Sequence, residues 1–93
     1  MMTLAQTVAK MISDDYKDRF VAEYYQTKIR YDKLRHLITQ VSAGTAKITP
    51  KCSLQILETQ LGDMDQYLAD LEVRAQIEDI DLQAAGNDMV CNN

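Results

Sequence analysis

The stretch of residues 15–41, DYKDRFVAEYYQTKIRYDKLRHLITQV, decides the fold because its apolar residues recur at alternating spacings of four and three. This spacing places them on one stripe of a long α-helix. Thr27 is the one polar member of the stripe. The stripe consists of Phe20, Tyr24, Thr27, Tyr31, Leu34, Ile38 and Val41.

A second stripe with the same spacing lies downstream. It consists of Leu54, Leu57, Leu61, Met64, Leu68, Leu71 and Ala75. Two such stripes can pack against each other along a seam, as in a coiled coil. Because the chain between them is short, the two helices must run antiparallel. The sequence therefore predicts an all-α fold built on an antiparallel helical hairpin.

The residues beside the two stripes predict the register of this hairpin. If the stripes are heptad positions a and d, the e positions of the two helices face each other, and so do the g positions. A register with Leu34 level with Leu61 then places opposite charges side by side. The predicted neighbours are Arg35 with Glu58, Lys28 with Asp65, Glu23 with Arg74, and Arg30 with Tyr67. The last pair predicts a cation–π contact.

Capping residues suggest where the helices begin and end. Ser13 to Asp15 supply an N-cap for the first long helix, although one unbroken helix from Thr3 is an alternative. Gly44 suits the left-handed end of that helix, and Thr49 with Pro50 suits the start of the second. The predicted parts are a short amphipathic N-terminal segment at 1–12, a hairpin domain at 13–82 with helices at about 13–41 and 50–82, and a flexible tail at 83–93.

The size of the chain predicts self-association. Its 93 residues form one domain, and two helices in line contact enclose only a small core. Apolar residues also lie on the outward faces, with Tyr25 and Ile29 on one helix and Val73 and Ile77 on the other. These patches indicate subunit contacts or a dock for the N-terminal segment. We therefore expect the hairpin to form a homo-oligomeric helical bundle.

Composition argues against several classes of function. A net charge of −4 disfavours binding to duplex DNA through its phosphates. The two cysteines, Cys52 and Cys91, lie far apart and suggest neither a zinc site nor a disulfide. The N-terminus has no apolar run long enough for a signal peptide or a membrane span, so we expect a cytoplasmic protein with no membrane partner.

Residue chemistry does not predict an enzyme. His36 is the single histidine, and no serine or cysteine is spaced around it as a nucleophile would be. The acidic residues of the second helix lack the loop pattern of a calcium site. We therefore expect no catalytic residue, no metal and no cofactor.

The g flank of the predicted hairpin is the candidate binding site. Arginine with tyrosine is a combination that grips phosphates and stacks on bases, which indicates a site for a small anion. The alternative is that these side chains pair the helices and form solvated faces. The candidate residues are Tyr16, Glu23, Arg30, Gln60, Tyr67 and Arg74, with Arg19 and Lys33 further round the first helix.

Several of these positions belong to a pattern that resembles a known family. The first helix contributes Tyr16-Lys17-Asp18-Arg19-Phe20, Glu23-Tyr24-x-Gln26 and Arg30-x-x-Lys33-Leu34. The second contributes Thr49-Pro50-Lys51, Gln60, Met64-x-x-Tyr67-Leu68 and Leu71-Glu72-x-Arg74-Ala75. Over roughly residues 16–82 this pattern resembles a family of small uncharacterised helical-hairpin proteins of crAss-like and other tailed phages.

The hairpin architecture is also similar to phage anti-defence proteins that form oligomers and sequester nucleotide signals of bacterial immunity. This second resemblance implies a non-enzymatic sponge in the host cytoplasm that holds a cyclic oligonucleotide or an ADP-ribose-type ligand. It rests on the fold, and a fold by itself does not carry a function. The alternative is a structural or adaptor hairpin that binds a host or phage protein through its exposed helical faces.

Overall fold

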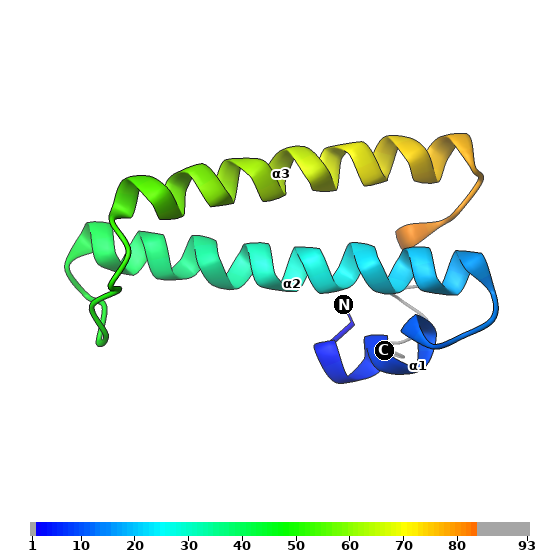
Figure 1. The fold of residues 1–93 in the computed structure, drawn as a ribbon, viewed down its shortest axis with the longest axis horizontal. Helices are drawn as coiled ribbons and strands as arrows, with labels where there is room; N and C mark the ends of the chain where they lie inside the picture. The colour runs from blue at the N-terminus through cyan, green and yellow to red at the C-terminus, as the bar shows by residue number, and fades with distance from the viewer. Residues whose placement is uncertain (1, 84–93) are drawn as a thin grey trace.

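A computed structural model describes residues 2–83, and within this range the chain forms three α-helices and no strand. These are α1 (Leu4–Met11), α2 (Tyr16–Ala43) and α3 (Leu54–Ile77). Helices α2 and α3 lie side by side and run antiparallel, and α1 packs against the first half of α2 (Figure 1). The all-α prediction is confirmed. None of the helices in the described range is both long enough and apolar enough to cross a membrane.

The α2–α3 seam follows the two stripes that the spacing predicts. Every member of both stripes is buried or partly buried. The most deeply buried are Leu71, Ala75 and Phe20, which are 1%, 2% and 3% exposed. Apolar area removed from water stabilises the hairpin by about 25 cal/mol per Å².

The main core lies at the end of the hairpin that α1 covers. Met2, ahead of α1, is almost fully buried there, and the Tyr25 hydroxyl donates a hydrogen bond of 2.7 Å to the Leu82 carbonyl oxygen. Tyr25 thus belongs to an apolar patch that the N-terminal segment covers. The sequence left two roles open for this patch, a subunit contact or a dock for that segment, and the structure shows the second. The buried cluster consists of Met2, Phe20, Val21, Tyr24, Tyr25, Leu68, Leu71, Ala75 and Ile80.

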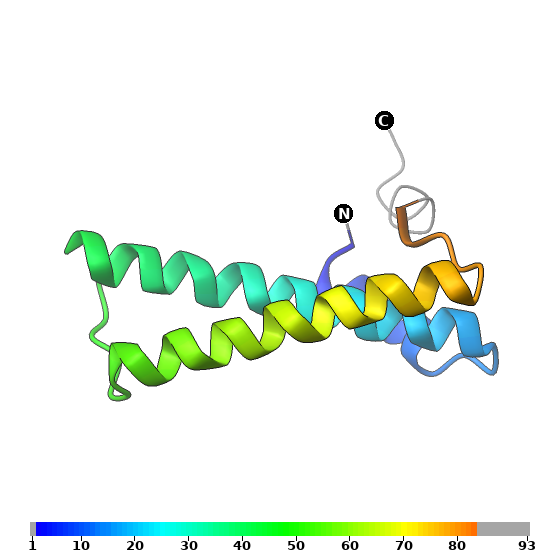
Figure 2. The same ribbon diagram turned by 90° about the horizontal axis from the view of Figure 1, so that it is seen from above.

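The loop end of the hairpin is packed more thinly. Tyr31, Leu34, Leu61 and Met64 are only partly buried, although all four belong to the seam. Figure 2 shows the reason, since α1 lies at the opposite end and only α2 and α3 run on towards their connecting loop. The loop end is therefore a two-helix layer.

Local caps explain where α1 and α2 begin and end. Thr3 and Gln6 form a reciprocal capping box at the start of α1. The Asp15 carboxylate accepts a 2.9 Å hydrogen bond from the Lys17 amide and caps α2. The N-terminal segment is thus a separate helix and does not continue into α2. Gly44 ends α2 at φ +76°, a conformation that glycine adopts without steric cost.

The predicted start of the second helix at Thr49 and Pro50 is wrong. Helix α3 begins at Leu54, and the Ser53 hydroxyl accepts a hydrogen bond of 3.3 Å from the Ile56 amide. Serine caps at least as well as threonine, and this later start places the first seam residue in the first turn of the helix. Thr49 and Pro50 lie instead in the loop between α2 and α3.

Helix α3 also ends earlier than predicted, at Ile77 and not near Leu82. Asp79 adopts φ +59°, and the Ile80 amide donates a hydrogen bond of 2.8 Å to the Ala75 carbonyl oxygen. This is a Schellman ending, which turns Ile80 back into the core. Apart from Gln83, the predicted tail at 83–93 lies outside the described residues.

The predicted ion pairs across the hairpin do not form. The three ion pairs within residues 2–83 are Lys10–Asp18, Lys28–Asp32 and Arg74–Glu78, and none of them joins α2 to α3. This corrects the pairs Arg35–Glu58, Lys28–Asp65 and Glu23–Arg74. Long exposed side chains gain little free energy from such pairing, so they stay solvated.

Two other polar contacts join α2 to α3, and the first of them lies close to the predicted register. The Tyr24 hydroxyl donates a 2.8 Å hydrogen bond to Glu72 Oε2, and Arg74 Nη2 donates one of 2.7 Å to the Tyr16 hydroxyl oxygen. In the predicted register Glu72 is level with Glu23, the neighbour of Tyr24. Burial and the Glu72 carboxylate raise the pKa of Tyr24, so its hydroxyl stays protonated and able to donate.

We expect Leu71→Ala to lower the free energy of unfolding by about 2–5 kcal/mol, because it opens a cavity beside Phe20 and Leu68. Denaturant unfolding followed by circular dichroism measures this loss. Val73→Ala is the control on the same helix, since Val73 is 58% exposed, and it should change stability by less than about 0.5 kcal/mol. If the two variants lost the same free energy of unfolding, the prediction that Leu71 packs in the α2–α3 seam would be wrong.

Candidate functional site

A hollow of about 430 Å³ lies where the three helices meet. It contains four of the eight residues that the sequence singles out, namely Tyr16, Arg19, Glu23 and Arg74. Its lining residues are Met11 from α1, then Tyr16, Arg19, Phe20, Glu23 and Gln26 from α2, and Arg74 from α3. The hollow thus joins two cations, two aromatic rings and one carboxylate.

Arg74 is held in place from three sides. Its Nη2 donates a 2.7 Å hydrogen bond to the Tyr16 hydroxyl, and its Nε lies 3.4 Å from Glu78 Oε2. The guanidinium carbon lies 5.0 Å from the centroid of the Phe20 ring, within the range of a cation–π contact. Half of the Arg74 side chain remains exposed. The guanidinium is therefore positioned before any ligand arrives.

The Tyr16 hydroxyl remains protonated in this setting. A hydrogen bond with Glu78 and, to a lesser degree, partial burial raise the pKa of Tyr16, and they outweigh the opposite effect of Arg74. The Tyr16 ring packs edge-on against Phe20 with centroids 6.2 Å apart. An aromatic wall with a neutral hydroxyl thus lies beside the guanidinium.

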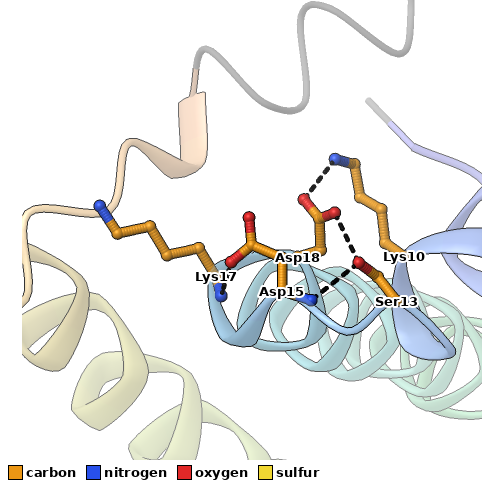
Figure 3. A network of polar contacts seen from close by, with 5 residues as sticks. All are labelled: Lys10, Ser13, Asp15, Lys17 and Asp18. Atoms are coloured by element: carbon orange, nitrogen blue, oxygen red, sulfur yellow. Dashed lines mark hydrogen bonds and ion pairs between the residues drawn. The ribbon is translucent and has the colours of Figure 1, made fainter.

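Arg19 is positioned by the turn between α1 and α2. Its Nη1 donates a 2.8 Å hydrogen bond to the Ser13 carbonyl oxygen. The Ser13 hydroxyl in turn donates to Asp18 Oδ2 at 2.9 Å and accepts from the Asp15 amide at 3.0 Å, while Lys10 Nζ lies 3.2 Å from Asp18 Oδ1 (Figure 3). This network fixes α1 relative to the start of α2, and it anchors one side of Arg19.

Gln26 connects α1 to the hollow. Its Nε2 donates to the buried Thr7 hydroxyl at 3.0 Å and to the Met11 sulfur at 3.3 Å. Sequence reasoning did not place Gln26, Phe20 or Met11 in the site. Gln26 follows Glu23 by three positions and could have been found from helical spacing, whereas nothing in the sequence indicates that Met11 docks there.

The other four candidate residues lie outside the hollow. Arg30, Lys33, Gln60 and Tyr67 are exposed, and their side chains make no hydrogen bond or ion pair with any residue of the range 2–83. The predicted cation–π contact of Arg30 with Tyr67 does not form within the described chain. Arg74 makes such a contact with Phe20 instead. The Arg30 half of the flank extends from the hollow towards the loop.

Two other hollows are less suited to an anion. The larger, of about 460 Å³, is lined by Glu72, Asp79 and Asp81 with apolar neighbours, so its carboxylates repel negative charge. His36 lies beside Asp32 and Arg35 at a smaller site of about 310 Å³ on α2. Within residues 2–83 no three His, Cys, Asp or Glu side chains gather as metal ligands.

Fold and site together define a small helical-hairpin protein with a cationic and aromatic hollow at the base of the hairpin. The model of the Sequestin family matches residues 14–77, and the chain belongs to this family. The matched range contains α2 and α3 and leaves out α1. The comparison with curated proteins and the comparison with solved structures each found no match.

We expect Asp18→Asn to weaken the α1–α2 turn in a pH-dependent way. Hydrogen bonds from Ser13 and then Lys10 lower the pKa of Asp18 below its ordinary value of 3.8. A carboxyl with a lowered pKa in the folded state stabilises that state above its unfolded pKa, and this contribution is lost as the pH falls. The stability difference between wild type and variant should therefore be present near neutral pH and shrink below about pH 4.

Denaturant unfolding at a series of pH values measures this difference. Asp14→Asn is the control, because it removes the same charge one residue before the N-cap, and the exposed Asp14 side chain makes no hydrogen bond or ion pair within residues 2–83. A loss in Asp18→Asn that is no larger than in Asp14→Asn, or that does not vary with pH, would show that the network does not stabilise the turn.

Proposed function

We propose that this protein binds a small anionic nucleotide and holds it without converting it. The observation that carries the proposal is the preset guanidinium of Arg74 between Tyr16 and Phe20, with Arg19 on the same hollow. The family name Sequestin suggests a sequestering protein, and it supports a binding role in preference to a catalytic one.

The chemistry of the hollow matches the parts of a nucleotide. Guanidinium groups fork onto phosphate oxygens, and aromatic rings stack on bases. The Glu23 carboxylate supplies an acceptor for ribose hydroxyls or for amino groups of a base. A volume of about 430 Å³ falls within the range of small-molecule pockets.

The resemblance to phage proteins supports a specific role for such binding. Cyclic oligonucleotides and ADP-ribose derivatives carry both the phosphates and the bases that the hollow is suited to hold. A phage protein that holds one of them in the host cytoplasm would keep it from its receptor and act as an inhibitor of defence. Arg30, Lys33, Gln60 and Tyr67 would serve a longer ligand, or one shared with a second subunit of a homo-oligomer.

A thermal-shift panel of cyclic dinucleotides, cyclic trinucleotides and ADP-ribose derivatives tests the proposal. We expect one class to raise the melting temperature, because a ligand that binds only the folded state stabilises it. Arg19→Ala should abolish this rise for any ligand, whereas Arg30→Ala should retain most of it for a ligand short enough to lie within the hollow. The ligand should be recovered unmodified after the complex is denatured.

Each alternative outcome has a definite meaning. If both variants lost the ligand-induced rise in melting temperature, the binding site would extend along the whole flank, from the hollow to Arg30. Conversion of the ligand would contradict sequestration. If no member of the panel raises the melting temperature, nucleotide binding is wrong.

The second candidate function is an adaptor that binds a host or phage protein. It is favoured by the outer face of α3, where Val73 and Ile77 are 58% and 78% exposed. Apolar side chains this open commonly mark a protein contact. Pull-down from an infected host with wild type and with Val73→Glu would test this function, since a partner of this face should be lost in the variant.

A further inference from the structure

The carboxylate of Glu78 occupies donors that a phosphate group would also use. Glu78 Oε2 lies 3.4 Å from Arg74 Nε, and the carboxylate accepts a hydrogen bond from the Tyr16 hydroxyl. Arg74 Nη2 completes the triangle by donating to the Tyr16 hydroxyl oxygen at 2.7 Å. Phosphate oxygens and carboxylate oxygens accept from the same N–H and O–H donors. In the free protein, an internal anion therefore already holds the guanidinium and the phenol of the hollow.

Glu78 is poorly placed to stabilise α3. It is the C-cap of this helix, where the negative end of the helix dipole disfavours a carboxylate. Its partner Arg74 precedes it by four positions, and this order of charges stabilises a helix less than the reverse order. The stability of the helix therefore does not account for a glutamate at this position, whereas a role towards the arginine of the hollow does.

The contact between Glu78 and Arg74 can open without a change in the backbone. Its 3.4 Å is longer than the roughly 2.7–2.9 Å of a strong charge-assisted hydrogen bond. The Glu78 side chain is 33% exposed, so its carboxylate can turn into water. The end of α3 is held separately, by the Glu78 amide on the Arg74 carbonyl oxygen at 2.9 Å and by the Ile80 amide. Release of Arg74 therefore needs only a rotation of the Glu78 side chain.

We propose that Glu78 is an internal competitor of the ligand, which holds Arg74 and Tyr16 in the free protein and gives way to a phosphate group on binding. This inference rests on the proposed function, because it concerns the regulation of that same site. A pyrophosphate group carries several negative charges and gains from Arg19 as well as Arg74. An anion with a single charge gains too little to displace Glu78. The competitor thus reserves the hollow for highly charged ligands.

Two variants that remove one negative charge each separate this role from general electrostatics. Glu78→Gln keeps the size of the side chain and an acceptor oxygen, but it removes the charge that competes with a phosphate. Asp79→Asn is the matched control, because the exposed Asp79 does not line the hollow of Arg74. Asparagine also tolerates the φ of +59° at this position. Far-UV circular dichroism checks that both variants are folded.

Binding of inorganic pyrophosphate is measured by NMR titration of isotope-labelled protein, with the Arg74 Nε–H signal as the reporter. We expect Glu78→Gln to bind pyrophosphate about two- to fivefold more tightly than the wild type, as the loss of one partly exposed ion pair allows. Asp79→Asn should change this affinity by less than about twofold, because solvent and salt screen its charge. In the wild type, the Glu78 Cδ signal should shift as pyrophosphate saturates the site. Acetate should shift the Arg74 signal only in Glu78→Gln.

Several results would overturn the internal competitor. These are an equal affinity of the wild type and Glu78→Gln for pyrophosphate, an equal gain in Asp79→Asn, and a Glu78 signal that does not move at saturation. Absence of pyrophosphate binding in Glu78→Gln, or an equal response of the wild type to acetate, would overturn it too.

Failure of the proposed function gives a different result. If no nucleotide raises the melting temperature while Glu78→Gln binds pyrophosphate more tightly than the wild type, the competitor stands and nucleotide binding is wrong. If a nucleotide binds the wild type and Glu78→Gln equally well, nucleotide binding stands and the competitor is wrong.

Discussion

The seam between α2 and α3 is the constraint on which the rest of the structure depends. With so short a chain, burial of one continuous apolar line is the main source of stability, and it fixes which residues of the two helices face each other. That register brings Arg74 within 2.7 Å of Tyr16, although 58 positions separate them along the chain. The hollow at the base of the hairpin therefore exists only while the seam is closed.

In the proposed nucleotide complex, the contacts that hold Arg74 would also reduce the cost of binding. A free arginine side chain loses considerable rotamer entropy when it grips a phosphate, whereas Arg74 has already lost much of it on folding. The contacts of Arg74 with Tyr16, Glu78 and the Phe20 ring offset this loss of rotamer entropy on folding. Glu78 also neutralises part of the positive charge of Arg74. To displace Glu78, an anionic ligand must therefore offer more than a single carboxylate.

The sequence predicted the helices and the seam because apolar spacing depends on local geometry that any helix shares. The Asp15 and Gly44 caps were predictable for the same reason. The start of α3 was not predictable in this way, because Thr49 and Ser53 are both good caps and only the path of the loop decides between them. The cross-helix ion pairs failed because exposed long side chains are not fixed by register alone. Helical spacing likewise indicated Tyr16, Arg19, Glu23 and Arg74, but Met11 enters the hollow only through the docking of α1.

The docking of α1 places one wall of the hollow outside the range that the family model matches. Residues 14–77 match the family, yet Met11 and the Thr7–Gln26 contact that closes one side of the hollow depend on residues before that range. A substitution at Met11, which is 45% exposed, can therefore reshape one wall while the α2–α3 seam, with Arg74 and the two rings, stays closed. One wall of the hollow can thus change its shape and polarity at little cost in folding free energy.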